Sequence, residues 1–319
     1  MIKLLEIKEY LKGIYGKYSI VIDPALRFLV AFLAMHLINQ NIGFMSDLAN
    51  PLTELLVALI CALLPYGLIC WILGAVILVH VFTISKEMAA ILGTFLICVA
   101  FLYYSFRPGD SIVLIMTPVL FALKIPYLIP LLIGLGTNVL SVIPMSAGIV
   151  ICYVISFVKN NAGALTNDSS VNIAEKFLPM VRGVFANRTM LITIIAFALA
   201  LLIVYLIHLL QVNYAWYYAA AAGTAVMIIV FLTGRTIFGI TLELPGFFLG
   251  ILASLLLVAA YIFFEFSVDY SRTEYTQMED DDYIYYVKAV PKMSVNIPDL
   301  KVQIFRPRRQ VRRGDEQDT

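Results

Sequence analysis

The sequence predicts an all-α, polytopic integral membrane protein with six to eight transmembrane helices, two of whose hydrophobic segments are proline-broken or re-entrant. Hydrophobic residues make up 61% of the 319 residues and charged residues only 13%, whereas soluble domains average about 25% charged residues. The hydrophobic residues fall in runs of about 20, the length of helix that crosses ~30 Å of hydrocarbon. Two longer runs contain prolines near their middle, where lipid cannot satisfy the backbone groups that are set free.

Residues 1–23 are expected to form an amphipathic N-terminal segment at the cytoplasmic face of the membrane. Apolar residues alternate with Lys3, Lys8, Lys12 and Lys17 at helical spacing, a pattern typical of interfacial helices. No hydrophobic run followed by a small-residue cleavage site is present there, so a cleavable signal peptide is not predicted. The four lysines beside the first span predict a cytoplasmic N-terminus.

The transmembrane domain is expected over residues 24–266, and its first span runs from Pro24 to Met45. This span contains four polar residues near its two ends. We interpret them as interfacial residues whose polar groups reach the lipid headgroups. They are Arg27, His36, Asn39 and Asn41.

The next hydrophobic run, residues 52–82, is too long for one upright span. At 1.5 Å per residue, roughly 31 residues would form a helix about 46 Å long, and Pro65 interrupts this run. Lys86 and Glu87 follow, and a further span is predicted from Met88 to Phe106.

The stretch from Arg107 to Gly148, which contains the broken run 110–145, is the segment in which we expect the function to reside. It is as apolar as a membrane span, yet prolines and glycines interrupt it repeatedly. Non-helical backbone survives at membrane depth only inside protein or beside a water-filled cavity. The candidate substrate- or ion-binding residues are Asn138, Ser141, Ser146, Thr137 and Lys124. The alternative is that the small polar side chains hydrogen-bond between packed helices and that the lysine reaches an interface.

Three further charged residues are secondary candidates, because an ionisable group at membrane depth is costly. They are Lys86, Glu87 and Glu243. The alternative interpretation places each of them at the membrane interface.

The second broken run repeats the pattern of the first. A shift of 61 residues places Pro65-Tyr66 on Pro126-Tyr127, and the units 52–106 and 110–158 each contain a broken run followed by a span. The closing span of the second unit, Ser146–Val158, is expected to be shorter. If the broken runs are re-entrant hairpins, each unit crosses once and the copies are inverted; if they cross fully, each unit crosses twice and the copies are parallel. Paired interrupted segments mark the binding site in many transporters.

A polar loop, residues 159–188 with an amphipathic patch at 173–185, precedes three final spans. These are Met190–Leu210, Tyr214–Leu232 and Leu244–Phe266, with Gly234-Arg235 between the last two. Six or eight crossings place this loop outside and the tail in the cytoplasm, which is the arrangement we favour. The excess of basic residues in the loop favours instead seven crossings, with the tail outside.

The tail, residues 267–319, is polar and contains two short segments rich in strand formers. Thr273–Met278 and Tyr283–Val290 flank an acidic run, which predicts a β-hairpin. Two strands alone are marginally stable in water, so we expect this hairpin to rest on the membrane domain, a second copy or a partner protein. The candidate docking residues are Asp281, Asp282, Tyr283, Tyr285 and Tyr286.

Enzymatic activity, cofactors, metal binding and nucleic-acid binding are not predicted. The sequence has no P-loop, G-x-S-x-G, H-E-x-x-H or Rossmann glycine pattern. Its three histidines, His36, His80 and His208, are expected to lie far apart, and its 4 cysteines lie inside apolar runs. The basic cluster 306–313 is explained by attraction to anionic lipid.

Two functions are compatible with these patterns. The first is a permease- or channel-like transport component of the cell membrane, with a cavity formed by segments 52–82 and 110–145. In that case Asn138→Leu should abolish transport without lowering the amount of folded protein. The alternative is a non-transporting membrane subunit of a larger cell-envelope assembly. It would recruit a protein partner, or a second copy of itself, through the C-terminal tail.

Overall fold

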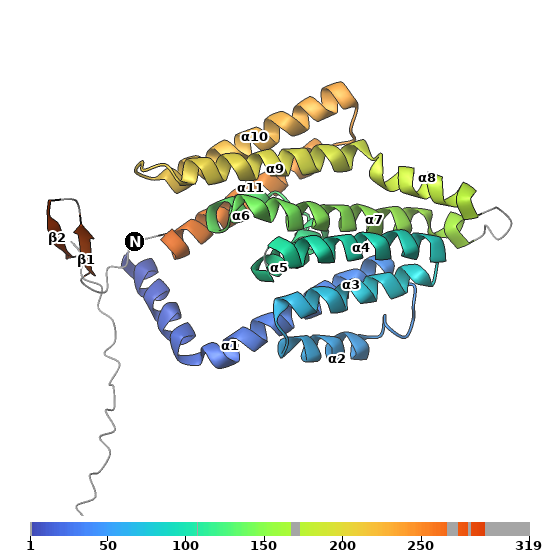
Figure 1. The fold of residues 1–319 in the computed structure, drawn as a ribbon, viewed down its shortest axis with the longest axis horizontal. Helices are drawn as coiled ribbons and strands as arrows, with labels where there is room; N and C mark the ends of the chain where they lie inside the picture. The colour runs from blue at the N-terminus through green and yellow to red at the C-terminus, as the bar shows by residue number, and fades with distance from the viewer. Residues whose placement is uncertain (1, 107, 167–172, 267–273, 280–281, 291–319) are drawn as a thin grey trace, which may run out of the picture. The chain divides into compact units, whose positions relative to one another are not determined.

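A computed structural model describes residues 2–106, 108–166, 173–266, 274–279 and 282–290 (Figure 1). The chain divides into two compact units. Residues 18–267 form a helical bundle, and residues 1–17 group with residues 268–319. The described part of the chain contains eleven α-helices, two short 3-10 helices and a two-stranded sheet. The all-α class predicted for the membrane domain is confirmed.

Six helices of the bundle are long. Helix α1 (Ile2–Ile42) is broken at Tyr18, whose φ of −120° and ψ of 20° are not helical, and its part beyond the break belongs to the bundle. The others are α4 (Lys86–Phe106), α7 (Val142–Thr166), α9 (Arg188–His208), α10 (Ala215–Phe238) and α11 (Leu244–Phe266). Among the described residues, α1, α7, α9, α10 and α11 contain stretches long and apolar enough to cross a membrane. A shorter helix, α8 (Ile173–Phe185), precedes α9.

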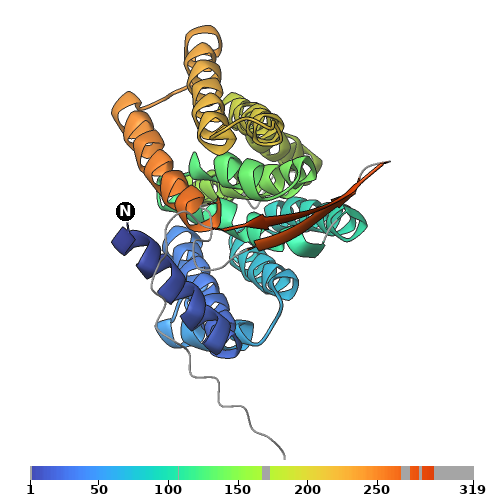
Figure 2. The ribbon, with the colours of Figure 1, turned by 90° about the vertical axis from the view of Figure 1, so that its left-hand side faces the viewer.

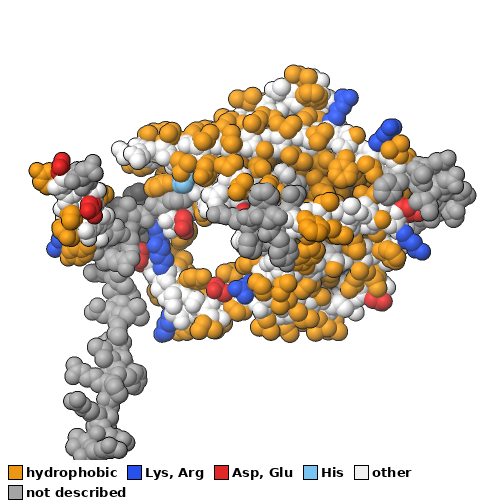
Figure 3. Space-filling model, viewed as in Figure 1, with side chains coloured by type: hydrophobic (Ala, Val, Ile, Leu, Met, Phe, Trp, Pro, Cys, Tyr) orange, Lys and Arg blue, Asp and Glu red, His pale blue; other side chains and the backbone are white. Residues whose placement is uncertain are grey.

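The outer surface of the bundle is apolar, as a lipid-facing surface would be. Hydrophobic side chains cover its middle in Figure 3, and lysine and arginine gather toward its right-hand end. Leu206 on α9, Ile229 on α10 and Leu249 on α11 are all more than half exposed. Exposed apolar area on this scale marks a membrane-facing surface rather than a water-facing one. The chain is therefore an α-helical membrane protein.

The first broken run forms a helical hairpin, called hairpin 1 below. It consists of α2 (Pro51–Ala62) and α3 (Tyr66–Phe82). Pro65, which has no N–H to continue a helix, lies at its tip directly before α3. The two open ends lie together, because Asn39 of α1 bonds both Glu54 near the start of α2 and His80 near the end of α3.

The second broken run forms hairpin 2, from α5 (Ser111–Ala122) and α6 (Leu128–Gly136). A tight turn that includes Lys124 and Pro126 joins them. The 3-10 helices η1 (Pro108–Asp110) and η2 (Val139–Ser141) flank its open end. There Ser141 Oγ donates a hydrogen bond of 2.6 Å to Asp110 Oδ2, so α5 begins where α6 ends.

The two hairpins enter the bundle from opposite ends. Helix α4 follows α3 after a short turn and packs back along it, so it ends near the tip of hairpin 1. Hairpin 2 begins at that end, where Cys70 Sγ donates to the carbonyl of Ser111 at 3.2 Å. Helix α7 then runs alongside α5, with Gly148 against Thr117, and returns to the other end. In Figure 1, hairpin 1 opens to the right and hairpin 2 to the left.

Helix α6 packs against α9, α10 and α11. Gly134 allows the close approach to α9, because a Cβ at this position would lie 2.7 Å from Val204 Cβ and 3.0 Å from the carbonyl oxygen of Leu201. At the tip of hairpin 2, Tyr127 packs edge-on against Phe231 and Phe247, with centroid distances of 5.8 and 5.2 Å. Figure 2, viewed along the bundle, shows the green segments between the blue and the orange helices.

Two predicted boundaries in the membrane domain are wrong. The span predicted as Ser146–Val158 is the 25-residue helix α7, because Pro144 is tolerated within its first turn. The span predicted to end at Leu232 continues through Gly234 and Arg235 to Phe238. It ends at Gly239, whose φ of 64° gives the left-handed cap typical of glycine. A basic residue in the last turn also suits the helix dipole.

The tail contains the predicted β-hairpin. Strands β1 (Glu274–Glu279) and β2 (Ile284–Ala289) pair antiparallel, with Gln277 opposite Tyr286. Of the docking candidates, Asp282, Tyr283, Tyr285 and Tyr286 are exposed, and the rings of Tyr283 and Tyr285 lie 6.1 Å apart. Asp281 lies outside the described residues.

Candidate functional site

The tip of hairpin 2 lies about halfway along the bundle, although Ala122, Leu123 and Lys124 in it are exposed. Phe121, just before the tip, and Tyr127, just after it, both pack on Phe197, with ring centroids 6.0 and 6.2 Å away. Phe197 is the tenth residue of the 21-residue helix α9, which at 1.5 Å per residue measures about 31 Å, the thickness of the hydrocarbon layer. The backbone of Lys124, between the two aromatic residues, therefore lies near the mid-depth of α9.

Lys124 has two unusual features. Its φ of 62° is left-handed, which costs a non-glycine residue roughly 1–2 kcal/mol, and strained backbone of this kind clusters at functional sites. Its ammonium group has no hydrogen bond or ion pair in the described part of the chain. A cation inside a membrane domain is unfavourable unless it faces water or an anion.

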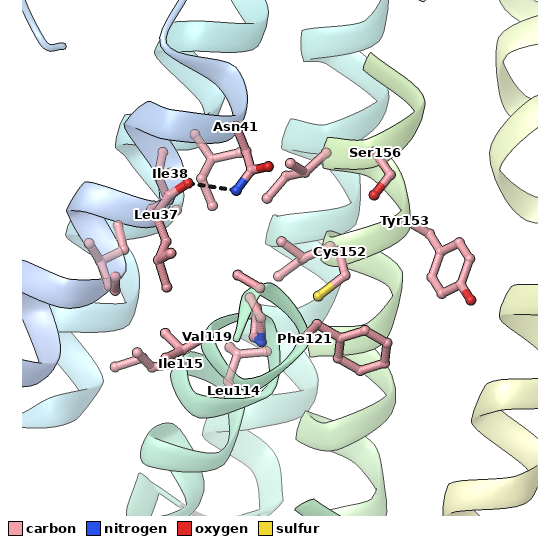
Figure 4. Close-up of a pocket in the computed structure, with 18 of the residues that line it drawn as sticks. Leu37, Ile38, Asn41, Leu114, Ile115, Val119, Phe121, Cys152, Tyr153 and Ser156 are labelled. Atoms are coloured by element: carbon pink, nitrogen blue, oxygen red, sulfur yellow. Dashed lines mark hydrogen bonds between the residues drawn. The ribbon is translucent and has the colours of Figure 1, made fainter. Parts of the chain in front are cut away.

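A cavity of about 510 Å³, lined by α1, α3, α4, α5 and α7, is the space that Lys124 faces. Most of its wall consists of leucine, isoleucine, valine and alanine side chains. The polar groups that project into it include Asn41 of α1 and Cys152 and Ser156 of α7 (Figure 4). Tyr153 points away from α1 in the same view, and its hydroxyl lies 3.3 Å from Thr193 Oγ1 of α9.

The charge of the cavity lining is positive. Lys124 is the only lysine, arginine, aspartate or glutamate among the lining residues, all of which the structure describes. A second lysine lies next to the lining, because Lys159 Nζ donates to Asn41 Oδ1 at 2.9 Å. The amide nitrogen of Asn41 donates to the carbonyl of Leu37 at 2.8 Å, the dashed line in Figure 4. The cavity is thus an apolar space with cations beside it and no acid in its wall.

Of the five predicted binding residues, Lys124, Thr137, Asn138, Ser141 and Ser146, only Lys124 lines this cavity. Thr137 Oγ1 donates to Ile133 O at 2.9 Å and Ser146 Oγ to Val142 O at 2.7 Å, both within one turn of the same chain segment. Ser141 joins the open end of hairpin 2 through Asp110. Asn138 directly precedes η2 and is half-buried. The structure therefore does not bring these four together with Lys124.

The secondary candidates lie at helix ends. Glu87 Oε2 accepts from Ser85 Oγ at 2.8 Å, and that hydroxyl accepts from Met88 N–H, so the three residues cap the start of α4. Lys86 is exposed at the same helix start. Glu243 is exposed before α11, and its carbonyl accepts from Phe247 N–H at 2.9 Å.

A second polar constellation, at the open end of hairpin 1, was not predicted. Glu54 is 5% exposed. Its Oε1 accepts from Asn39 Nδ2 at 2.9 Å, and its Oε2 lies 3.1 Å from His36 Nδ1. Asn39 was expected among the lipid headgroups, but its second amide hydrogen is bonded to the carbonyl of Leu48 at 2.9 Å. The sequence signal that could have found this site is a lone glutamate inside an apolar run.

The hydrogen-bond partners in this network determine which ring nitrogen of His80 carries the proton. Met45 N–H can only donate, so His80 Nδ1, 3.3 Å away, accepts, and His80 Nε2 donates to Asn39 Oδ1 at 3.0 Å. His80 is fully buried. The expectation that His36 and His80 lie far apart is wrong, because both belong to one network through Asn39 and Glu54. Helical spacing explains this, since residues 36, 39 and 40 share one face of α1 while 37, 38 and 41 face the cavity.

Within the described residues, no group of three or more histidine, cysteine, aspartate and glutamate side chains could hold a metal ion. Comparison with protein-family models, with curated proteins and with solved structures gave no match. The class of the protein, an α-helical membrane protein with two internal hairpins and a cationic cavity, therefore rests on its own geometry.

Proposed function

We propose that the protein is a transport component of the cell membrane whose substrate occupies the cavity beside Lys124. The observation that carries this proposal is a lysine near mid-depth of the bundle that has no partner among the described residues and lines a 510 Å³ cavity. Cavities that bind small molecules commonly measure about 300–1,000 Å³ and have mostly apolar walls with a few polar groups. An intramembrane ionisable residue facing such a space is expected to act on a substrate or an ion.

The order of the elements supports transport through an inverted repeat. In each unit a hairpin, broken at Pro65 or Pro126, is followed by a long helix, α4 or α7. Helix α2 ends at Ala62 and α5 at Ala122, while α4 ends at Phe106 and α7 at Thr166. The spacing is therefore 60 residues at both points, close to the shift of 61 in the sequence. Inverted repeats with interrupted helices at their interface are typical of secondary transporters.

With two hairpins the proposed protein has six crossings: α1, α4, α7, α9, α10 and α11. The chain then leaves the bundle on the side where α1 enters it. Four lysines in the part of α1 before its break at Tyr18 favour the cytoplasm for that side, which puts the tail in the cytoplasm as well. The loop between α7 and α9 lies outside the cell in this arrangement. Its excess of basic residues favours instead the cytoplasmic side. Seven crossings would require one of the hairpins to be a full crossing.

The proposal is tested by asking whether water reaches the cavity wall. In a variant with its four cysteines replaced by alanine, Ser156→Cys is introduced and the protein is reconstituted into liposomes. A membrane-impermeant sulfonated maleimide should label position 156, because water fills a transport cavity. Leu191→Cys in the same background is the control, since Leu191 is exposed on α9 close to Thr193, which lies opposite Tyr153 of α7. Equal resistance of both positions to labelling would overturn the proposal.

The tail supports a second candidate function, recruitment of a partner protein by a non-transporting subunit. The observation that favours it is the two-stranded sheet with exposed tyrosines, among them Tyr283, Tyr285 and Tyr286, since two strands alone are marginal in water. Deletion of residues 267–319 separates the two functions. A transporter should keep most of its flux and its labelling at position 156, whereas an assembly subunit should lose its partner in a pull-down.

A further inference from the structure

We infer that the cavity takes an organic anion with an apolar body, the anionic group lying at Lys124. This inference rests on the proposed function and adds to it the chemical class of the substrate. The ammonium group of Lys124 has no partner in the described part of the chain, and no acidic side chain lines the cavity. In a low-dielectric site, a bound anion is the partner that offsets the cost of this charge.

The wall of the cavity away from the lysine ammonium group determines the polarity of the rest of the ligand. Leu37 and Ile38 of α1 and Ile115 and Val119 of α5 line the cavity, and Figure 4 shows them bordering it. These side chains can contact an alkyl or ring system but cannot bond a polar one. An apolar body gains binding free energy with each CH₂ group that it buries against this wall. A small, fully polar anion such as phosphate or sulfate would leave this wall in contact with water.

The far part of the cavity offers limited polar bonding. The Asn41 side chain already bonds Lys159 through Oδ1 and the carbonyl of Leu37 through Nδ2, which leaves one amide hydrogen. Ser156 is exposed on α7 and its hydroxyl has no hydrogen bond in the described part of the chain. The ligand is therefore expected to carry its charge at one end and few further hydrogen-bonding groups, near Asn41 and Ser156.

The inference is tested by protection of Ser156→Cys, in the four-alanine background, from maleimide. The full chain is placed in nanodiscs of neutral phosphatidylcholine, and decanoate is compared with decanamide, which has the same chain and no charge. Decanoate should protect position 156 at about tenfold lower concentration than decanamide, because a hydrogen bond to a charged group is stronger than one to a neutral group. Lys124→Met should remove that difference, and Lys124→Arg should keep it. Lys86→Met is the matched control and should also keep it, since Lys86 is exposed at the start of α4.

A further arm separates a free anion from a lipid. Replacing part of the phosphatidylcholine by phosphatidylglycerol should protect position 156 without decanoate if the ligand is an anionic lipid, and should have no effect if it is a free amphiphile. Either result supports the anionic class, provided that protection depends on Lys124. Equal protection by decanoate and decanamide overturns the inference while leaving the cavity and the proposed function in place. Absence of labelling at position 156 in every condition overturns the proposed function itself.

Discussion

Hairpin 1 and hairpin 2 share one sequence pattern, an apolar run broken by a central proline, but different interactions hold them. Hairpin 1 is fixed at its open end, where Glu54 and His80 both bond to Asn39. Hairpin 2 is fixed at its tip, where Tyr127 lies among phenylalanine rings, and along α6 by close packing. At its open end a side-chain bond from Ser141 to Asp110 joins α5 to the chain after α6.

The comparison indicates that the two hairpins have different roles. The polar groups of hairpin 1 are satisfied by one another, and such a network orders a structure rather than binding a ligand. Hairpin 2 carries a lysine without a partner in the described residues to the cavity. We therefore propose that hairpin 1 anchors α1, whose opposite face lines the cavity. Hairpin 2 is proposed to bind the substrate.

The largest expected effect is that of breaking the anchor of hairpin 1. Glu54→Leu should lower the free energy of unfolding by about 3 kcal/mol, because removing one partner of a buried charged network leaves the others unsatisfied. Glu54→Gln keeps an acceptor for Asn39 and should cost about half as much. The measurement is denaturation of the purified protein in mixed micelles with increasing sodium dodecyl sulfate. The control is Glu243→Leu, at an exposed position, which should stay within about 0.5 kcal/mol of the wild type. If the two leucine variants unfold alike, hairpin 1 is not held by this network.

A smaller loss is expected from disturbing the packing of hairpin 2. Gly134→Ala should cost about 2 kcal/mol, because its Cβ would meet Val204 and the backbone carbonyl of Leu201, and overpacking typically costs 1–3 kcal/mol. Gly163→Ala on α7 is the matched helical control, since a Cβ there meets open space. It should be neutral or slightly stabilising. Equal stability of the two alanine variants in the same denaturation assay would show that α6 is not tightly packed against α9.

The sequence predicted the position of both breaks because proline acts locally. Pro65 and Pro126 remove a backbone donor wherever the surrounding helices lie, so a break near each could be placed without knowledge of the fold. The choice between a hairpin and a full crossing depends on contacts between distant residues. The bonds from Asn39 to His80 and from Ser141 to Asp110, over 41 and 31 residues, establish the hairpins.

Lys124 could be selected as a candidate from the sequence for the same reason, because a lysine in an apolar run is unusual in any fold. The small polar residues of the 110–145 run could not be assigned from sequence, because a serine hydroxyl that bonds its own helix looks the same as one that faces a cavity. Glu54 was not predicted as part of a polar site, because it follows Pro51 closely and resembles an ordinary acidic residue in the first turn of a helix.

The smallest effect separates anchoring from binding at the open end of hairpin 2. Ser141→Ala should lower the free energy of unfolding by about 1 kcal/mol, since it removes a hydrogen bond to the Asp110 carboxylate. Ser146→Ala is the matched control and should change stability by less than about 0.5 kcal/mol, because its hydroxyl bonds a carbonyl of its own helix. Neither variant should alter the protection of position 156 by decanoate, as neither serine lines the cavity. Loss of that protection with unchanged stability would return Ser141 to the substrate site and make the open end of hairpin 2, rather than its tip, the place where the ligand binds.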